Sequence, residues 1–156
     1  MTPRVGLGFD IHPFSDDPDR PLVLAGVTIE GRGLAGHSDA DAVAHAICDA
    51  LLGAAGLGDI GTHFPDHDPA YAGIDSTRLL REVVKTVTAK WDIGNVDATV
   101  VLEAPRLAPH REEMERRLAG IVGAPVSVKA KRAEALGALG RREGVACFAV
   151  ALLMPR

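Results

Sequence analysis

The sequence predicts a single two-layer domain of the α/β or α+β class, spanning residues 1–156. Strand-like segments alternate with amphipathic helical segments along the chain, as in domains of this class. A chain of 156 residues that is 47% hydrophobic can bury one core. No repeat, low-complexity tract or linker-like stretch divides it.

The N-terminal third is expected to hold two strands and one long helix. Arg4–Phe9 and Pro21–Ile29 have strand-like patterns. The helix is predicted over Ser38–Leu57, with Ser38 and Asp41 as a capping-box-like start and Gly58 as a stop signal. One side of this helix is apolar, and the opposite side is a polar stripe of Ser38, Asp41, His45 and Asp49.

The rest of the chain continues the alternation. A long loop is expected over 58–73, and loops of that length inside a compact domain are usually functional or mobile. Asp75 or Ser76 is expected to cap the next helix. The remaining elements are predicted as a helix to about Trp91, a strand over 95–103, a helix over 108–122, a strand over 125–131, a short turn or helix over 134–140 and a strand over 145–154.

The composition argues against several classes of protein. A formal net charge of −4 and an aromatic content of 4% disfavour nucleic-acid binding. The N-terminus has no long apolar segment, and the longest apolar run, Val145–Met154, is too short to span a bilayer. Cys48 and Cys147 are expected to be buried reduced thiols. We therefore expect a cytoplasmic protein that binds neither nucleic acid nor membrane.

Asp10 and His12 are the first candidate metal ligands. Residues two apart on a strand project from the same face, so this carboxylate and imidazole are expected to lie side by side. Both groups are common zinc ligands. A turn aspartate beside a half-buried histidine would explain the same residues, because short D-x-H matches arise by chance.

His45 on the polar stripe offers a third ligand. Asp49, four residues later, is predicted to hydrogen-bond the imidazole and to fix its tautomer. Three protein ligands would leave the fourth zinc position open, as in catalytic sites. An exposed helical histidine beside a solvated aspartate is the alternative.

His37 and Ser38 come just before the same helix, where backbone amides favour an anionic group. Simple capping by Ser38 is the alternative, and the two interpretations are compatible. Asp41 is expected to be a capping or supporting residue rather than a metal ligand. The aspartates of 59–61 and 64–68 could bind sugar hydroxyls, although aspartates are also ordinary turn residues.

Several motifs, in this order, resemble the 2-C-methyl-D-erythritol 2,4-cyclodiphosphate synthase family over essentially the whole chain. They are Gly6-Leu7-Gly8-Phe9-Asp10-Ile11-His12, the segment 35–46 with its H-S-D-x-D-x-x-x-H pattern, and the segments 49–61, 64–69 and 94–97. The resemblance implies an α+β fold: a two-layer single domain with a mixed four-stranded sheet and helices on one face. It also implies a homotrimer with active sites between subunits.

The resemblance implies a role for each group of residues. Zinc or a similar divalent ion would be bound by Asp10, His12 and His45, and a magnesium or manganese ion on the substrate diphosphate by Glu134. His37 and Ser38 would hold the phosphate region, and His37 would help to stabilise the transition state. The methylerythritol part would contact Asp59, Ile60, Gly61, Phe64, Asp66 and Asp68. The cytidine would contact Ala104, Pro105, Arg106, Leu107 and Ala108.

The implied reaction cyclises 4-diphosphocytidyl-2-C-methyl-D-erythritol 2-phosphate in non-mevalonate isoprenoid biosynthesis. The 2-phosphate attacks the β-phosphorus, CMP leaves, and 2-C-methyl-D-erythritol 2,4-cyclodiphosphate forms. A phosphorus–oxygen lyase of this kind needs no protein nucleophile. Because both reacting groups belong to one molecule, the enzyme folds the substrate and neutralises its charge.

The chain departs from the family pattern in two places. Where the family usually has consecutive threonines, this chain has Lys131 and Arg132. We expect one of them to contact phosphate through its charge, Arg132 being at the position that aids the transition state; exposed basic residues at a strand end are the alternative. Arg142 replaces a glycine beside Arg141, in a segment that lines a cavity on the threefold axis in the family, so the backbone there must tolerate a side chain.

Other functions stay open at this point. One is a zinc-dependent phosphohydrolase or phosphotransferase on the same scaffold, with water as the nucleophile. Another is a non-catalytic trimer that binds isoprenoid diphosphates. A structural α/β domain with incidental histidines is the third, and it predicts that the purified protein binds no zinc.

Overall fold

A mixed four-stranded sheet forms one layer of the computed structural model, which describes residues 1–156. In spatial order its strands are β1 (Arg4–Pro13), β6 (Gly144–Pro155), β4 (Trp91–Val101) and β5 (Val126–Lys131). Strand β6 is antiparallel to both neighbours, whereas β4 and β5 are parallel. The predicted α+β class and mixed four-stranded sheet are therefore confirmed.

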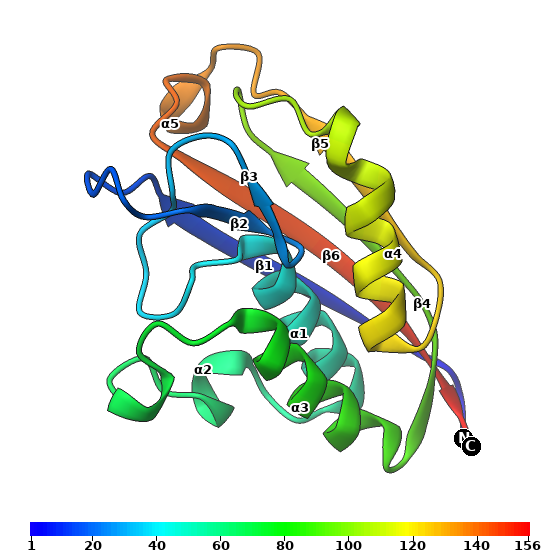
Figure 1. The fold of residues 1–156 in the computed structure, drawn as a ribbon. Helices are drawn as coiled ribbons and strands as arrows, with labels where there is room; N and C mark the ends of the chain where they lie inside the picture. The colour runs from blue at the N-terminus through cyan, green and yellow to red at the C-terminus, as the bar shows by residue number, and fades with distance from the viewer.

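Helices form the second layer, on one face of this sheet (Figure 1). They are α1 (Ala42–Ala55), α3 (Ser76–Thr88) and α4 (Arg111–Val122). The smaller elements are the hairpin of β2 (Leu22–Leu24) and β3 (Val27–Ile29), the short helices α2 (Ile60–His63) and α5 (Gly137–Gly140), and the 3-10 turns η1 (Pro69–Tyr71) and η2 (Ala108–His110). None of the helices is both long enough and apolar enough to cross a membrane.

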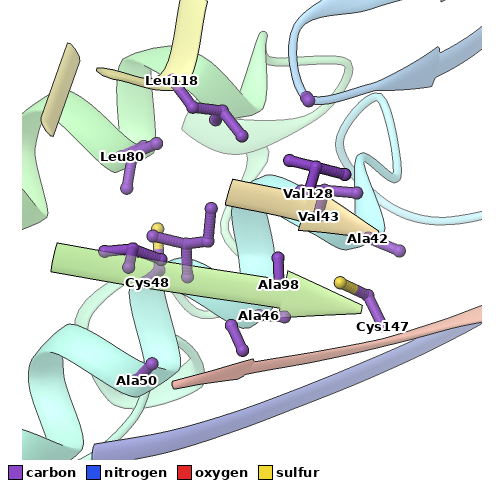
Figure 2. Packing of buried hydrophobic residues seen from close by; sticks show 14 of the residues in the cluster. Ala42, Val43, Ala46, Cys48, Ala50, Leu80, Ala98, Leu118, Val128 and Cys147 are labelled. Atoms are coloured by element: carbon purple, nitrogen blue, oxygen red, sulfur yellow. The ribbon is translucent and has the colours of Figure 1, made fainter. Parts of the chain in front are cut away.

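Helix α1 packs directly on the backbone of β1, because β1 has glycines where the two elements touch. A Cβ on Gly8 would lie 1.8 Å from the carbonyl oxygen of Ala46, and one on Gly6 would lie 1.9 Å from that of Ala50. Figure 2 shows the small side chains of Ala46 and Ala50 within this packing. The close approach holds the first turns of α1 beside Asp10 at the C-terminal end of β1.

The alternation along β1 gives its two faces opposite characters. Gly6, Gly8, Asp10 and His12 lie on the α1 side, and the residues between them face outward. Seven large apolar side chains of this outer face are 39–70% exposed: Val5, Leu7, Phe9 and Ile11 on β1, and Phe148, Val150 and Met154 on β6. No element of this chain covers them.

Several predicted boundaries were wrong: Trp91, the predicted end of a helix, instead begins β4, and others differ in the N-terminal third. Helix α1 is capped by Asp41, whose carboxylate accepts from the amides of Val43 and Ala44, and it ends at Gly56 with φ 74°. Ser38 does not start the helix, because Ala40 has a left-handed φ of 58° that separates Ser38 from the helical residues. The single strand predicted over 21–29 is a hairpin that turns at Ala25 and Gly26, whose φ values of 56° and 71° suit a tight two-residue turn.

Candidate active site

Asp10, His12 and His45 converge on one point, as predicted. The Asp10 Oδ2 atom lies 2.7 Å from His12 Nε2 and 3.1 Å from His45 Nδ1, and these two nitrogens are 3.3 Å apart. One carboxylate oxygen and two imidazole nitrogens form a donor set that zinc and similar divalent ions prefer. These three residues can therefore hold a divalent cation.

The three side chains are mostly shielded from water, being 24%, 17% and 12% exposed for Asp10, His12 and His45. Burial raises the pKa of Asp10, but hydrogen bonds and charge from both histidines outweigh it, so the pKa is lowered. Burial lowers the pKa of His45, but its hydrogen bond to Asp10 and the charge of Asp10 outweigh it, so the pKa is raised. A cation therefore competes with a proton for His45.

Each imidazole has a partner that leaves one nitrogen free for a metal ion. His12 Nδ1 donates to the carbonyl oxygen of Ala35 at 3.0 Å, which leaves Nε2 as the ligand atom. His45 Nε2 lies 2.7 Å from the Ser76 hydroxyl, which leaves Nδ1. The tautomers are thus inferred from the hydrogen-bond partners.

The predicted partner of His45 was wrong. Asp49 accepts from the amide of Ile60 at 2.8 Å and so holds the start of α2 instead. Helical side chains point toward the N-terminal end of their helix, so the His45 imidazole leans away from Asp49 and toward the start of α3.

A cavity of about 540 Å³ opens on the three candidate ligands. The predicted residues that line it, besides those ligands, are His37, Ser38, Ile60, Gly61, Phe64 and Asp66. Two predicted residues do not line this cavity: Asp59 caps α2, and Asp68 caps η1. Tyr71 also lines the cavity but was not predicted from the sequence. Its ring packs edge-on against Phe64, with the ring centroids 5.4 Å apart. A lone tyrosine in an Asp-rich loop was the feature of the sequence that could have indicated it.

The segment that carries His37 and Ser38 is held from two sides. On one side it is bonded to the loop of residues 58–73. His37 Nε2 donates to the carbonyl oxygen of Asp68 at 2.8 Å, and the amide of Gly73 donates to the carbonyl oxygen of His37 at 2.8 Å. From the other side, the guanidinium of Arg20 donates to the carbonyl oxygens of Leu34, Gly36 and Ser38. Arg20 lies in a polar loop with no motif that would have pointed to it.

A second cavity of about 530 Å³ lies between the end of β4 and the end of β5. Of the predicted cytidine and phosphate contacts, Pro105, Arg106, Leu107, Ala108, Lys131 and Arg132 line it. Ala104, Glu134 and Arg141 do not, and Arg141 pairs with Glu143 at 2.6 Å. Arg142 lines it too, and its φ of 62° confirms that a side chain occupies a conformation suited to glycine.

Arg132 is fixed to the wall of this second cavity. Its Nη2 and Nε atoms lie 3.0 Å and 3.3 Å from Oε2 of Glu103, whose side chain is only 3% exposed. The Glu103 carboxylate also accepts from the amide of Ala133 at 2.6 Å. The hydrogen bond from Arg132 lowers the pKa of Glu103, which keeps this anchor ionised. The two cavities have no lining residue in common, so the predicted site is divided within one chain.

The fold and the site define an α+β protein with an Asp/His/His centre that can bind a divalent cation. The chain belongs to the YgbB family, whose model matches residues 3–154. It is 56% identical over 161 residues to a 2-C-methyl-D-erythritol 2,4-cyclodiphosphate synthase from Laribacter hongkongensis, covering 100% of this chain and 98% of the relative.

Two further similarities bear on the whole chain. A bifunctional enzyme IspD/IspF from Anaeromyxobacter dehalogenans is 54% identical over 153 residues, covering 96% of this chain and 39% of the relative. This chain thus spans well under half of that relative's length. The solved IspF from Plasmodium falciparum, a CDP complex, is 34% identical with a TM-score of 0.86, covering 99% of this chain and 97% of that one.

Proposed function

We propose that this chain is a 2-C-methyl-D-erythritol 2,4-cyclodiphosphate synthase of the non-mevalonate isoprenoid pathway. It converts 4-diphosphocytidyl-2-C-methyl-D-erythritol 2-phosphate to the cyclic diphosphate and CMP. The observation that carries the proposal is the match at 56% identity across the whole chain. In the structure, the motif residues Asp10, His12 and His45 also meet at one point. This convergence favours a metal site over incidental histidines.

The proposed reaction requires positive charge in the site, because the negatively charged 2-phosphate must approach another phosphate of the same molecule. A divalent ion bound at Asp10, His12 and His45 would supply charge and Lewis acidity toward phosphoryl oxygens. His37 would donate to the phosphate region beside Ser38, and Arg132 and Lys131 would replace the usual threonines by charge at the other cavity.

The product follows from the geometry of one folded substrate. A bond forms between an oxygen of the 2-phosphate and the β-phosphorus, and the bond from that phosphorus to the CMP oxygen breaks. The first cavity would hold the methylerythritol part, with its loop excluding water that would otherwise give open-chain products. The second would hold the cytidine, a proposal supported by the CDP complex of the P. falciparum relative.

Glu134 is proposed to hold a second divalent ion, magnesium or manganese, on the diphosphate. It is exposed and lies two residues after Arg132, which lines the second cavity. Glu134→Gln keeps the size of the side chain and removes its charge. We expect it to lower turnover and to raise the magnesium concentration needed for half-maximal rate. An unchanged magnesium dependence would exclude Glu134 as a ligand.

The proposed assembly is a homotrimer in which the first cavity of one subunit faces the second cavity of its neighbour. Two observations support it: the divided site, and the apolar outer face of β1 and β6. Exposed apolar patches of this extent mark protein interfaces. Sedimentation equilibrium at micromolar concentration measures the mass directly, and a stable monomer would contradict the assembly.

Two assays test the activity and the shared site. Phosphorus NMR of the reaction mixture should show the cyclic diphosphate and CMP. Open-chain phosphates alone would favour a phosphohydrolase, and binding without turnover would favour a non-catalytic trimer.

Co-refolding of the His45→Ala variant with the Arg132→Ala variant tests the shared site. It should restore about one quarter of the wild-type rate, because random assembly of the two variants gives that share of sites in which one subunit keeps His45 and its neighbour keeps Arg132. Two cavities that act within one subunit would give no recovery.

A further inference from the structure

We infer that Ser76 and Asp39 are positioning residues for the metal ligand His45. In this arrangement the Asp39 carboxylate orients the Ser76 hydroxyl, and the hydroxyl accepts the proton of His45 Nε2, so that Nδ1 presents its lone pair to the cation. The inference rests on the proposed metal site. It replaces Asp49, the residue that helical spacing indicated for this role.

The contacts form a continuous chain. His45 Nε2 lies 2.7 Å from Ser76 Oγ, and Ser76 is fully buried. The Ser76 hydroxyl donates to Asp39 Oδ1, and the Ser76 amide donates to Asp39 Oδ2 at 3.1 Å. The amide of Asp41 also donates to Asp39 Oδ1, at 3.1 Å. The carboxylate is thus fixed by the backbone on both sides.

The directions of these hydrogen bonds determine the tautomer of His45. A carboxylate only accepts, so the Ser76 proton points to Asp39 and the lone pairs of the hydroxyl remain for His45. His45 Nε2 must then carry a proton, and Nδ1 becomes the metal-binding nitrogen. Ser38 Oγ lies farther from Nε2, at 3.2 Å, and itself accepts from the Ala40 amide, so it is the weaker partner.

The same residues tie the metal ligand to the loop that lines the first cavity. Ser76 is the first residue of α3, and only Ile74 and Asp75 separate it from the loop of residues 58–73. The amide of Asp39 donates to the carbonyl oxygen of Ile74 at 3.1 Å. A displacement of this end of the loop therefore moves the group that holds His45.

Zinc affinity tests the inference without relying on turnover. Competition with a chromophoric chelator gives the dissociation constant of wild type, Ser76→Ala, Asp39→Asn and Thr77→Ala. Supporting partners of metal-bound histidines typically contribute about 10- to 100-fold in affinity, and we expect this loss for Ser76→Ala and a smaller one for Asp39→Asn. Thr77→Ala removes a hydroxyl from the same helix start, bonded to Asp75 rather than to His45, and should bind zinc within about twofold of wild type.

Spectroscopy distinguishes positioning from a general effect on folding. In zinc-loaded wild type, long-range ¹H–¹⁵N spectra should show His45 with a protonated Nε2 and a metal-bound Nδ1. In Ser76→Ala, the visible spectrum of bound Co²⁺ should shift, whereas Thr77→Ala should keep the wild-type spectrum. A metal-bound Nε2 in wild type would overturn the inference even if Ser76→Ala did not fold.

The outcomes separate the two proposals. Wild-type protein that binds no zinc would refute the metal site itself. Wild type that binds zinc, with Ser76→Ala equally tight, would refute only the positioning role of Ser76. An Asp39→Asn variant with wild-type affinity, beside a weakened Ser76→Ala, would remove Asp39 from the arrangement.

Discussion

Gly8→Ala should destroy the metal centre although Gly8 is not itself a ligand. The added Cβ would lie 1.8 Å from the Ala46 carbonyl oxygen and 2.7 Å from the Ala50 amide nitrogen. Both atoms belong to the backbone of α1, so no side chain can turn aside to make room. Ordinary contacts require more than about 3 Å, so the helix must move away from β1 by at least roughly 1.2 Å.

The size of the effect follows from which turn of the helix moves. Ala46 is adjacent to His45, so the displacement separates His45 Nδ1 from Asp10 and His12 on β1. Metal–ligand distances tolerate only about 0.2 Å, and we therefore expect zinc affinity to fall by at least about 100-fold. Overpacking also lowers the free energy of unfolding, by about 1–3 kcal/mol or more for a clash with backbone.

Gly53→Ala is the matched control on the same helix. A Cβ there would have no neighbour within 4 Å, so the substitution should raise the free energy of unfolding by about 0.5–1 kcal/mol and leave zinc affinity unchanged. Chelator competition and urea unfolding measure both quantities for the two variants. A folded Gly8→Ala protein with wild-type zinc affinity would refute the argument that this close contact sets the position of His45.

Three other substitutions or conditions have defined outcomes. The affinity for zinc should fall about tenfold per pH unit below the raised pKa of His45, because the proton competes with the metal. Zinc titrations from pH 8 to pH 5 measure this, and an affinity that does not change with pH would contradict it. Arg132→Ala should lower kcat by about 100-fold if its charge acts in the transition state, and a rise in KM alone would argue for ground-state binding only. Asp41→Ala should lower the free energy of unfolding by about 3 kcal/mol, because α1 loses its cap and the amides of Ala25 and Gly26 lose their acceptor. Urea unfolding measures the loss, and a change below about 1 kcal/mol would contradict the role of this buried carboxylate.

Local periodicity predicted part of the centre of the site. Alternation along a strand places Asp10 and His12 on one face, and the helical pattern places the buried face of α1 against the sheet. Neither pattern says which strand the helix lies on. The G-x-G spacing of Gly6 and Gly8 contains that information, since only a strand without side chains lets α1 approach this closely.

Partners that come from a different element were not predictable in this way. Asp49 is near His45 by helical spacing, but the imidazole points toward the start of α3, where Ser76 lies 31 residues away in the chain. Local spacing likewise made Ser38 resemble a helix cap, but in the structure its hydroxyl lies 3.2 Å from His45 Nε2. Pairings set by tertiary packing leave no trace in the local pattern of either segment.

The candidate site residues of one chain are divided between two cavities. One chain presents candidate ligands for a cation beside one cavity and basic residues beside another, and each group alone would neutralise only part of the proposed substrate, which has three phosphorus atoms. The face that would bring neighbours together is the outer side of β1, whose inner side carries Asp10 and His12. A substitution that disturbs the outer row, such as Leu7→Asp, thus acts on assembly and on the position of the metal ligands through the same strand, so activity and subunit association should be lost together.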